Sequence, residues 1–152
     1  PHLYRWGRMS PWCEFLQRKD QQAIEYALKG KEMGSTFPDI YIVLAFSNYR
    51  LGQFDLACQF AQEFMNQDRA DQRSGFIMLF MKLLLQVLKD ESDILYLEEQ
   101  ILSLLPAFRA VEIEIPFYTL LADHYKKHKD LVKALEIQDR LIYYLEHDFN
   151  QH

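Results

Sequence analysis

Two histidines, His124 and His128, have the spacing in this sequence that most suggests a site of chemistry. Four residues apart on a helix, two imidazoles lie on one face and can chelate a divalent cation. The residues between them are Tyr125, Lys126 and Lys127, so the catalytic glutamate of an HExxH metalloprotease is missing and two lysines oppose a dication. We therefore expect no metal site here and interpret the histidines as a polar helix end.

Acidic side chains are abundant but form no catalytic motif. The pairs Glu98/Glu99 and Glu112/Glu114 stand beside no evident nucleophile. Paired acids perform acid–base chemistry when burial separates their pKa values, and a solvated helix face is the simpler interpretation. The sequence contains no GxSxG motif, Walker-type phosphate loop or Cys–His signature. It therefore predicts a protein that is not an enzyme and needs no cofactor.

The composition indicates a folded helical domain. Of the 152 residues, 49% are hydrophobic and 26% are charged, and only five each are Gly and Pro, which favours helices over a turn-rich sheet. The net charge of −5 disfavours nucleic acid as a partner. No apolar run reaches the roughly 18 residues of a membrane span. Cys13 and Cys58 form no CxxC pair, so we expect a reducing, cytoplasmic location.

Residues 38–66 have the features of two helices joined by a tight turn. Pro38 suits a first helical turn, and Gly52 suits the left-handed position that ends a helix. Small residues at Ala45 and Ala57 let paired helices approach closely. This hairpin resembles the tetratricopeptide repeat in the residues Tyr41, Leu44, Ala45, Gly52, Phe54, Ala57, Ala61 and Phe64. It departs from the family at Asn48, where an aromatic residue is usual.

The pattern recurs on both sides of this hairpin. Ala23 lies 34 residues before Ala57, which is the period of the family, in a helix expected over 21–31. The partner of that helix, from about 9 to 18, is degenerate, as a first repeat often is. Residues 115–146 match again, with Lys129 in place of the turn glycine, through Tyr118, Leu121, Ala122, Tyr125, Leu131 and Ala134.

The middle unit is longer, because Ala134 lies 77 residues after Ala57. We expect helices at 74–88, buried on most sides, and at 94–105. Residues 111–115 alternate like a strand and are interpreted as a connector or a frayed helix start. The predicted fold is all-α, with about seven or eight helices in antiparallel hairpins that form a right-handed superhelical arc. The expected repeats of this single domain are 4–37, 38–71, 72–114 and 115–148.

The resemblance implies a concave face, lined by the first helix of each hairpin, where the family binds its ligands. It places there Asp39, Ile42, Phe46, Tyr49, Arg50, Thr119, Asp123, Lys126 and Lys127, with Arg8, Trp12, Phe15 and Leu16 from the degenerate unit. Tyr49 and Arg50 are the first choice, because these residue types dominate binding hot spots. Phe46 and Trp12 are open to a second interpretation as core residues. Ile42 and Phe46 occupy positions that need polar donors in the family's clamp for acidic chaperone tails, which disfavours such a partner.

Two functions follow as hypotheses. The first is a binding module that recognises a protein or peptide segment on a rigid, preorganised concave face. The alternative is a regulatory or sensor segment of a larger bacterial-type signalling or transcription regulator, in which the helices also form a homodimer. The start at Pro1 and the open-ended helix 131–149 lead us to expect a fragment of a longer protein.

Overall fold

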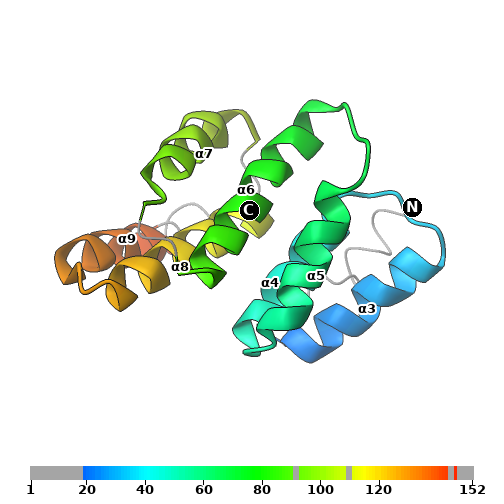
Figure 1. Ribbon diagram of the computed structural model, residues 1–152, viewed down its shortest axis with the longest axis horizontal. Helices are drawn as coiled ribbons and strands as arrows, with labels where there is room; N and C mark the ends of the chain where they lie inside the picture. Colours follow the sequence, from blue (N-terminus) through cyan, green and yellow to red (C-terminus); the bar gives the residue numbers. More distant parts are fainter. Residues whose placement is uncertain (1–18, 91–92, 109–110, 144–145, 147–152) are drawn as a thin grey trace.

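The computed structural model describes residues 19–90, 93–108, 111–143 and 146, and these residues are all-helical, as the composition predicts. The described elements are α3 (Asp20–Glu32), α4 (Ile40–Arg50), α5 (Phe54–Met65), α6 (Gln72–Leu88), α7 (Leu95–Phe108), α8 (Val111–Lys127) and α9 (Leu131–Tyr143) (Figure 1). The predicted helix at about 9–18, with Trp12 and Cys13, lies outside the described residues. None of the helices in the described ranges is long and apolar enough to cross a membrane.

The two predicted hairpins close through the same kind of turn. Gly52 between α4 and α5 has a φ of +76°, and Lys129 between α8 and α9 has a φ of +64°. In each turn the next amide N–H donates a hydrogen bond back to a carbonyl of the preceding helix. These bonds, each 2.8 Å long, join Gln53 to Asn48 and Asp130 to Tyr125. The sequence prediction that Lys129 takes the place of the turn glycine is confirmed.

Packing of small residues holds each hairpin together. Ala57 on α5 and Ala134 on α9 are buried where α5 packs against α4 and α9 packs against α8. Ala23 is buried on α3, which packs against the other side of α4. All three alanines are buried, as predicted from their spacing. The predicted partner helix before α3 lies outside the described residues, so an equivalent environment for Ala23 stays a prediction. Asn48, the departure from the family pattern, is buried and donates a hydrogen bond of 2.7 Å to the carbonyl of Leu44.

Helix α8 begins earlier than predicted. Residues 111–115 form its first turns, so the helix-start interpretation holds for them, and Pro116 lies inside the helix. The strand-like alternation is overridden because Ile113 and Phe117, one helical turn apart, are both completely buried. Helix α7 likewise continues past the predicted end at 105, with Pro106 inside it.

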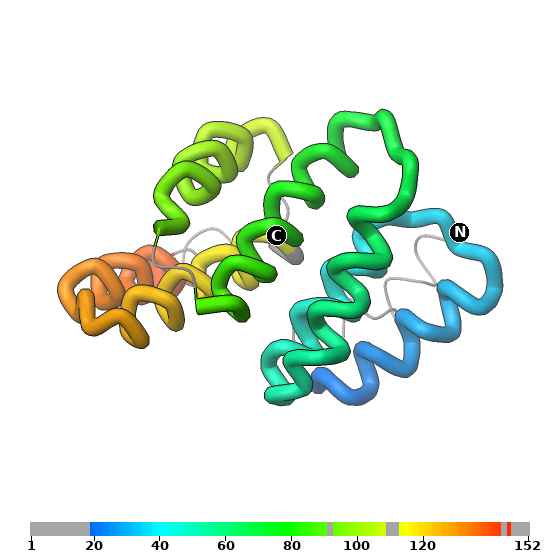
Figure 2. The backbone as a smooth tube through the Cα atoms, viewed as in Figure 1, coloured from blue at the N-terminus to red at the C-terminus, as the bar shows by residue number. Residues whose placement is uncertain are grey.

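Helix α6 occupies the middle of the molecule and packs against α5, α7 and α8. In Figure 2 it runs between the α3–α5 group at one end and the α8–α9 hairpin at the other. Helix α8 also packs directly against α4. The structure therefore brings together the first helices of two hairpins that are well separated along the chain.

Candidate functional site

Three of the residues assigned to the binding face lie inside the protein. Asp39, Ile42 and Phe46 are buried, because α4 packs against α3 on one side and α5 on the other. Phe46 also meets the ring of Phe80 on α6, with the ring centroids 6.4 Å apart. Residues buried to this degree offer no surface to a partner. Their assignment to the binding face is therefore not kept, and the core interpretation holds for Phe46.

Asp39 instead ties the beginning of α4 to the beginning of α6. The Nε of Arg73 donates a hydrogen bond of 2.8 Å to Oδ1 of Asp39, and the second guanidinium nitrogen binds Oδ2. Such a two-point pair fixes direction as well as distance. The two residues are 34 positions apart, the predicted repeat period. The separation alone does not predict the pair, because positions one period apart are equivalent but need not be in contact.

Arg50 is part of a second internal ion pair rather than of a binding face. Its Nε donates a hydrogen bond of 2.9 Å to Oδ1 of Asp20, at the start of α3. The side chains of Arg50 and Asp20 are only 8% and 9% exposed. The Arg50 guanidinium also lies 5.0 Å from the centre of the Phe46 ring. Arg50 therefore joins α4 to α3, and the predicted Tyr49/Arg50 pair is divided between two sides of α4.

Tyr49 and Asp123, by contrast, come together from the two hairpins. The Tyr49 hydroxyl donates a hydrogen bond of 2.8 Å to Oδ2 of Asp123, across 74 residues of sequence. Asp123 is exposed, whereas Tyr49 is partly buried. Lys126 is exposed one helical turn after Asp123. We name the surface formed by Tyr49, Phe54, Asp123 and Lys126 the α4–α8 seam.

Aromatic packing fixes the position of the Tyr49 ring. It stacks on Phe46 with centroids 5.6 Å apart, and it contacts the half-exposed ring of Phe54 at 5.7 Å. Burial raises the pKa of the Tyr49 phenol well above its usual range, and the Asp123 carboxylate adds to the increase. The hydroxyl therefore remains a hydrogen-bond donor at every physiological pH.

The other predicted residues of α8 point elsewhere. The Thr119 hydroxyl donates a hydrogen bond of 2.8 Å to the carbonyl of Ile115 in its own helix. Lys127 reaches toward the end of α6, where its Nζ lies 3.4 Å from Oδ1 of Asp90. His128 approaches the same oxygen at 3.2 Å. Among the residues predicted to form the binding face, Tyr49, Asp123 and Lys126 belong to the α4–α8 seam.

The two histidines are close together, but their settings differ. Their ring centroids are 4.4 Å apart; His124 is buried, whereas His128 lies beside Asp90. Within the described ranges no three or more His, Cys, Asp or Glu side chains form a group that could hold a metal ion. The interpretation as a polar helix end fits His128 and is wrong for His124, because His124 is buried in the protein and its ring packs against the ring of Tyr125.

Glu98 is the buried acid that the sequence interpretation placed on a solvated face. The Tyr125 hydroxyl donates a hydrogen bond of 2.5 Å to its Oε1, and Lys133 Nζ lies 3.4 Å from Oε2. Burial raises the pKa of Tyr125, and the hydrogen bond to Glu98 adds to this. The group joins α7, α8 and α9. Position 98 falls on the same helical stripe as the buried Ile101 and Leu105, and that periodicity is the signal that the sequence offers.

Comparison with models of known protein families, with curated proteins and with solved structures finds no match to this chain. The resemblance to the tetratricopeptide repeat therefore rests on the residues of the two hairpins at 38–66 and 115–146.

Proposed function

We propose that this protein is a protein- or peptide-binding module of the tetratricopeptide-like kind, and that the α4–α8 seam is its contact surface. The observation that carries the proposal is the hydrogen bond between Tyr49 and Asp123, 74 residues apart. It joins predicted contact residues of two hairpins on one exposed surface. Together, Tyr49 and Asp123 form a larger contact surface than either hairpin offers alone.

The chemistry of the seam suits a polypeptide segment. A tyrosine held by stacked neighbours loses little side-chain entropy on binding, so more of its contact energy appears as affinity. A carboxylate can accept several hydrogen bonds, so Asp123 has the capacity for a donor from a partner as well as for Tyr49. Lys126, one turn further along α8, supplies the opposite charge. An extended segment fits this surface if it carries a hydrogen-bond donor for Asp123 and, further along, an acidic group for Lys126.

Site-specific photocrosslinking tests this proposal. Benzoylphenylalanine at Lys126 should crosslink a protein or peptide from a lysate of source cells, whereas the same probe at Gln62, exposed on α5, should not. Gln62 is a better control position than its neighbour Glu63, because Glu63 forms an ion pair with Lys31 at 2.5 Å and a probe at that position would break it.

The crosslinked partner then allows affinities to be measured. Tyr49→Ala should weaken its binding about thirtyfold, the effect of a hot spot worth about 2 kcal/mol, while Gln62→Ala leaves it unchanged. Circular dichroism must show the same helical content for both variants. Crosslinking from Gln62 with none from Lys126 would place the partner on the opposite side and remove the seam from the proposal.

A further inference from the structure

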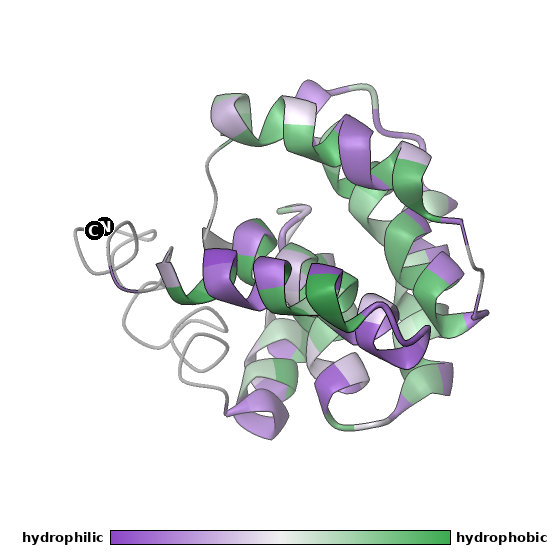
Figure 3. Cartoon of the chain, turned by 90° about the vertical axis from the view of Figure 1, so that its left-hand side faces the viewer, coloured by the Kyte–Doolittle hydropathy of each residue, from purple (hydrophilic) through white to green (hydrophobic). Residues whose placement is uncertain are grey.

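Helix α9 carries an exposed apolar stripe. Ala134 and Ile137 face α8 and are buried, but Leu135 is 60% and Ile142 is 52% exposed. We name the exposed leucine and isoleucine side chains on this face the α9 stripe: Leu131, Leu135 and Ile142. Val132 and Tyr143 flank it and are exposed as well. Figure 3 turns this end of the molecule toward the viewer, and α9 crosses the front with hydrophobic segments visible on it.

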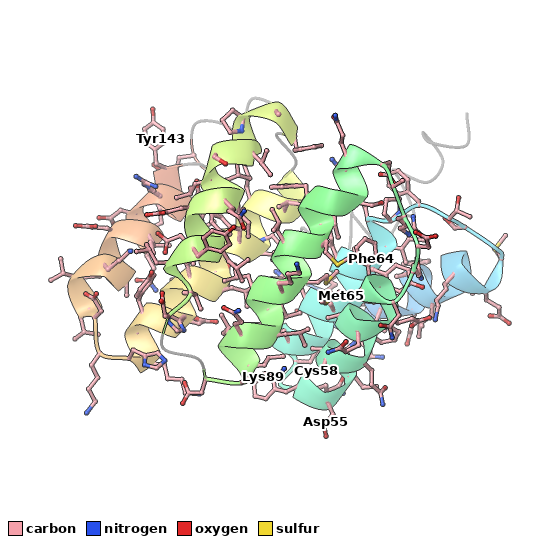
Figure 4. All side chains as sticks on the ribbon, turned by 45° about the horizontal axis from the view of Figure 1, so that its top comes forward. Asp55, Cys58, Phe64, Met65, Lys89 and Tyr143 are labelled. Carbon is pink, nitrogen blue, oxygen red and sulfur yellow. The ribbon has the colours of Figure 1, made fainter. Side chains whose placement is uncertain are left out.

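The other hairpin shows what covers an equivalent stripe. In the alignment that places Ala57 on Ala134, Leu135 and Ile142 correspond to Cys58 and Met65 of α5. Cys58 and Met65 are packed against the core, and α5 packs against α6. Figure 4 shows Cys58 beside Lys89 at the end of α6. Burial raises the pKa of the Cys58 thiol, and the Lys89 charge opposes part of that increase. Leu131 corresponds to Phe54, which is half-exposed, so the comparison holds for Leu135 and Ile142. At these two positions α5 is packed against the core, whereas α9 is exposed.

Charge indicates the kind of helix that fits. Glu136, Asp139 and Arg140 are exposed on α9. By helical geometry Asp139 lies between the stripe and the flanking Val132 and Tyr143, whereas Arg140 lies on the side of α9 away from the stripe. The charge nearest the stripe is therefore negative.

We propose that the α9 stripe binds a basic amphipathic helix of another protein, laid along α9 as α6 is laid along α5. The apolar side of the partner helix covers Leu135 and Ile142, and its basic row faces Asp139. A second copy of this chain is a poorer fit. Two α9 helices paired antiparallel about Ile137 place Asp139 of each copy beside Glu136 of the other, and like charges in contact weaken such a pair.

Two synthetic peptides of about 18 residues, or five helical turns, test this. Both have the same Leu/Ala apolar stripe; one has lysine and the other glutamate at the flanking positions. Fluorescence anisotropy with the whole protein should show the lysine peptide binding at least about tenfold more tightly than the glutamate peptide. Equal affinity for the two peptides would show that Asp139 and Glu136 do not select the partner and would overturn the assignment.

Variants locate the binding. Leu135→Ser with Ile142→Ser should weaken lysine-peptide binding at least about tenfold, and Leu28→Ser with Leu95→Ser, at leucines exposed on α3 and α7, should leave it unchanged. Asp139→Lys should reverse the preference between the peptides. An unchanged affinity in the Leu135/Ile142 variant would place the peptide elsewhere. Sedimentation equilibrium that shows a dimer, broken by the same two substitutions, would make the occupant a second copy.

This surface is separate from the seam, and the two proposals fail separately. Tyr49→Ala should leave lysine-peptide binding unchanged, because Tyr49 lies on α4 and its polar partner is on α8. A loss of lysine-peptide binding in Tyr49→Ala, with the helical content intact, would mean that the peptide binds the seam instead of the α9 stripe.

Discussion

The two best-matched hairpins, α4–α5 and α8–α9, have the same turn and the same buried alanine, yet their outer surfaces differ. In the first, Phe46 is buried against α6, while its counterpart Asp123 is exposed on α8. In the second, Leu135 is exposed where Cys58 of the first is packed against the core. The hairpin pattern therefore determines how two helices join. Which outer faces are covered depends on the helices packed beside the hairpin.

Equivalent positions should respond unequally to truncation, and the largest contrast is at Phe46. Phe46→Ala leaves a cavity among stacked rings and should cost about 3–5 kcal/mol. Asp123→Ala, the equivalent change, removes an exposed side chain and should cost no more than about 1 kcal/mol. Urea unfolding followed by circular dichroism measures both. Equal losses would mean that the two hairpins are equally enclosed.

The ion pairs at the ends of the first helices give the next contrast. Arg50→Ala leaves the nearly buried Asp20 without its cation and should cost about 3 kcal/mol. Lys127, the equivalent residue, is 62% exposed, and Lys127→Ala should change stability by less than about 1 kcal/mol. Arg50→Lys serves as a control, since it keeps the charge but loses the Nε hydrogen bond. If Lys127→Ala were as damaging as Arg50→Ala, the pair with Asp90 would have to be structural.

Substitutions that overpack the two hairpins should give a smaller difference in stability between them. Ala57→Leu should cost about 1–3 kcal/mol, because α5 is held between α4 and α6 and cannot shift to admit the larger side chain. Ala134→Leu should cost less, since α9 is open on its outer side and can move away from α8. Thermal unfolding of both variants and of the exposed control Gln62→Leu tests this. A melting temperature unaffected by Ala57→Leu would contradict the packing described for that hairpin.

The smallest expected effect lies in the two turns. Lys129→Gly should stabilise the protein by about 1 kcal/mol, because a residue with a side chain is strained at its φ of +64°. Gly52→Ala should destabilise it by a similar amount. A Cβ at Gly52 meets no atom within 4 Å outside its own residue and its chain neighbours, so this cost is local backbone strain rather than a clash with surrounding side chains. Opposite shifts in urea midpoint are the expected result, and shifts of the same sign would refute it.

Local features of the fold were predictable from the sequence, because short-range chemistry determines them. The turns at Gly52 and Lys129 follow from the requirements of helix ends, and the buried alanines follow from helix spacing. The outward-facing residues were not predictable in the same way. Phe46 is in the core because α4 packs against α3 and α5 and because its ring meets Phe80 of α6. Glu98 is paired inside the protein because Tyr125 and Lys133 approach it from two later helices. The helix pattern shows that position 98 faces inward with Ile101 and Leu105, but the partners that accept a charge there come from distant segments, which no single helix pattern contains.

The hydrogen bond between Tyr49 and Asp123 also bears on how the chain folds. In a stack of helical repeats each unit contacts its neighbours, so that order can spread from any point and the ends can unravel independently. Here α4 also packs against α8, and the Tyr49 hydroxyl reaches a residue 74 positions later. Closing so long a loop has an entropy cost that is recovered when both hairpins have formed. We therefore expect unravelling of the α8–α9 hairpin to be coupled to α4, so that the described helices melt together rather than hairpin by hairpin.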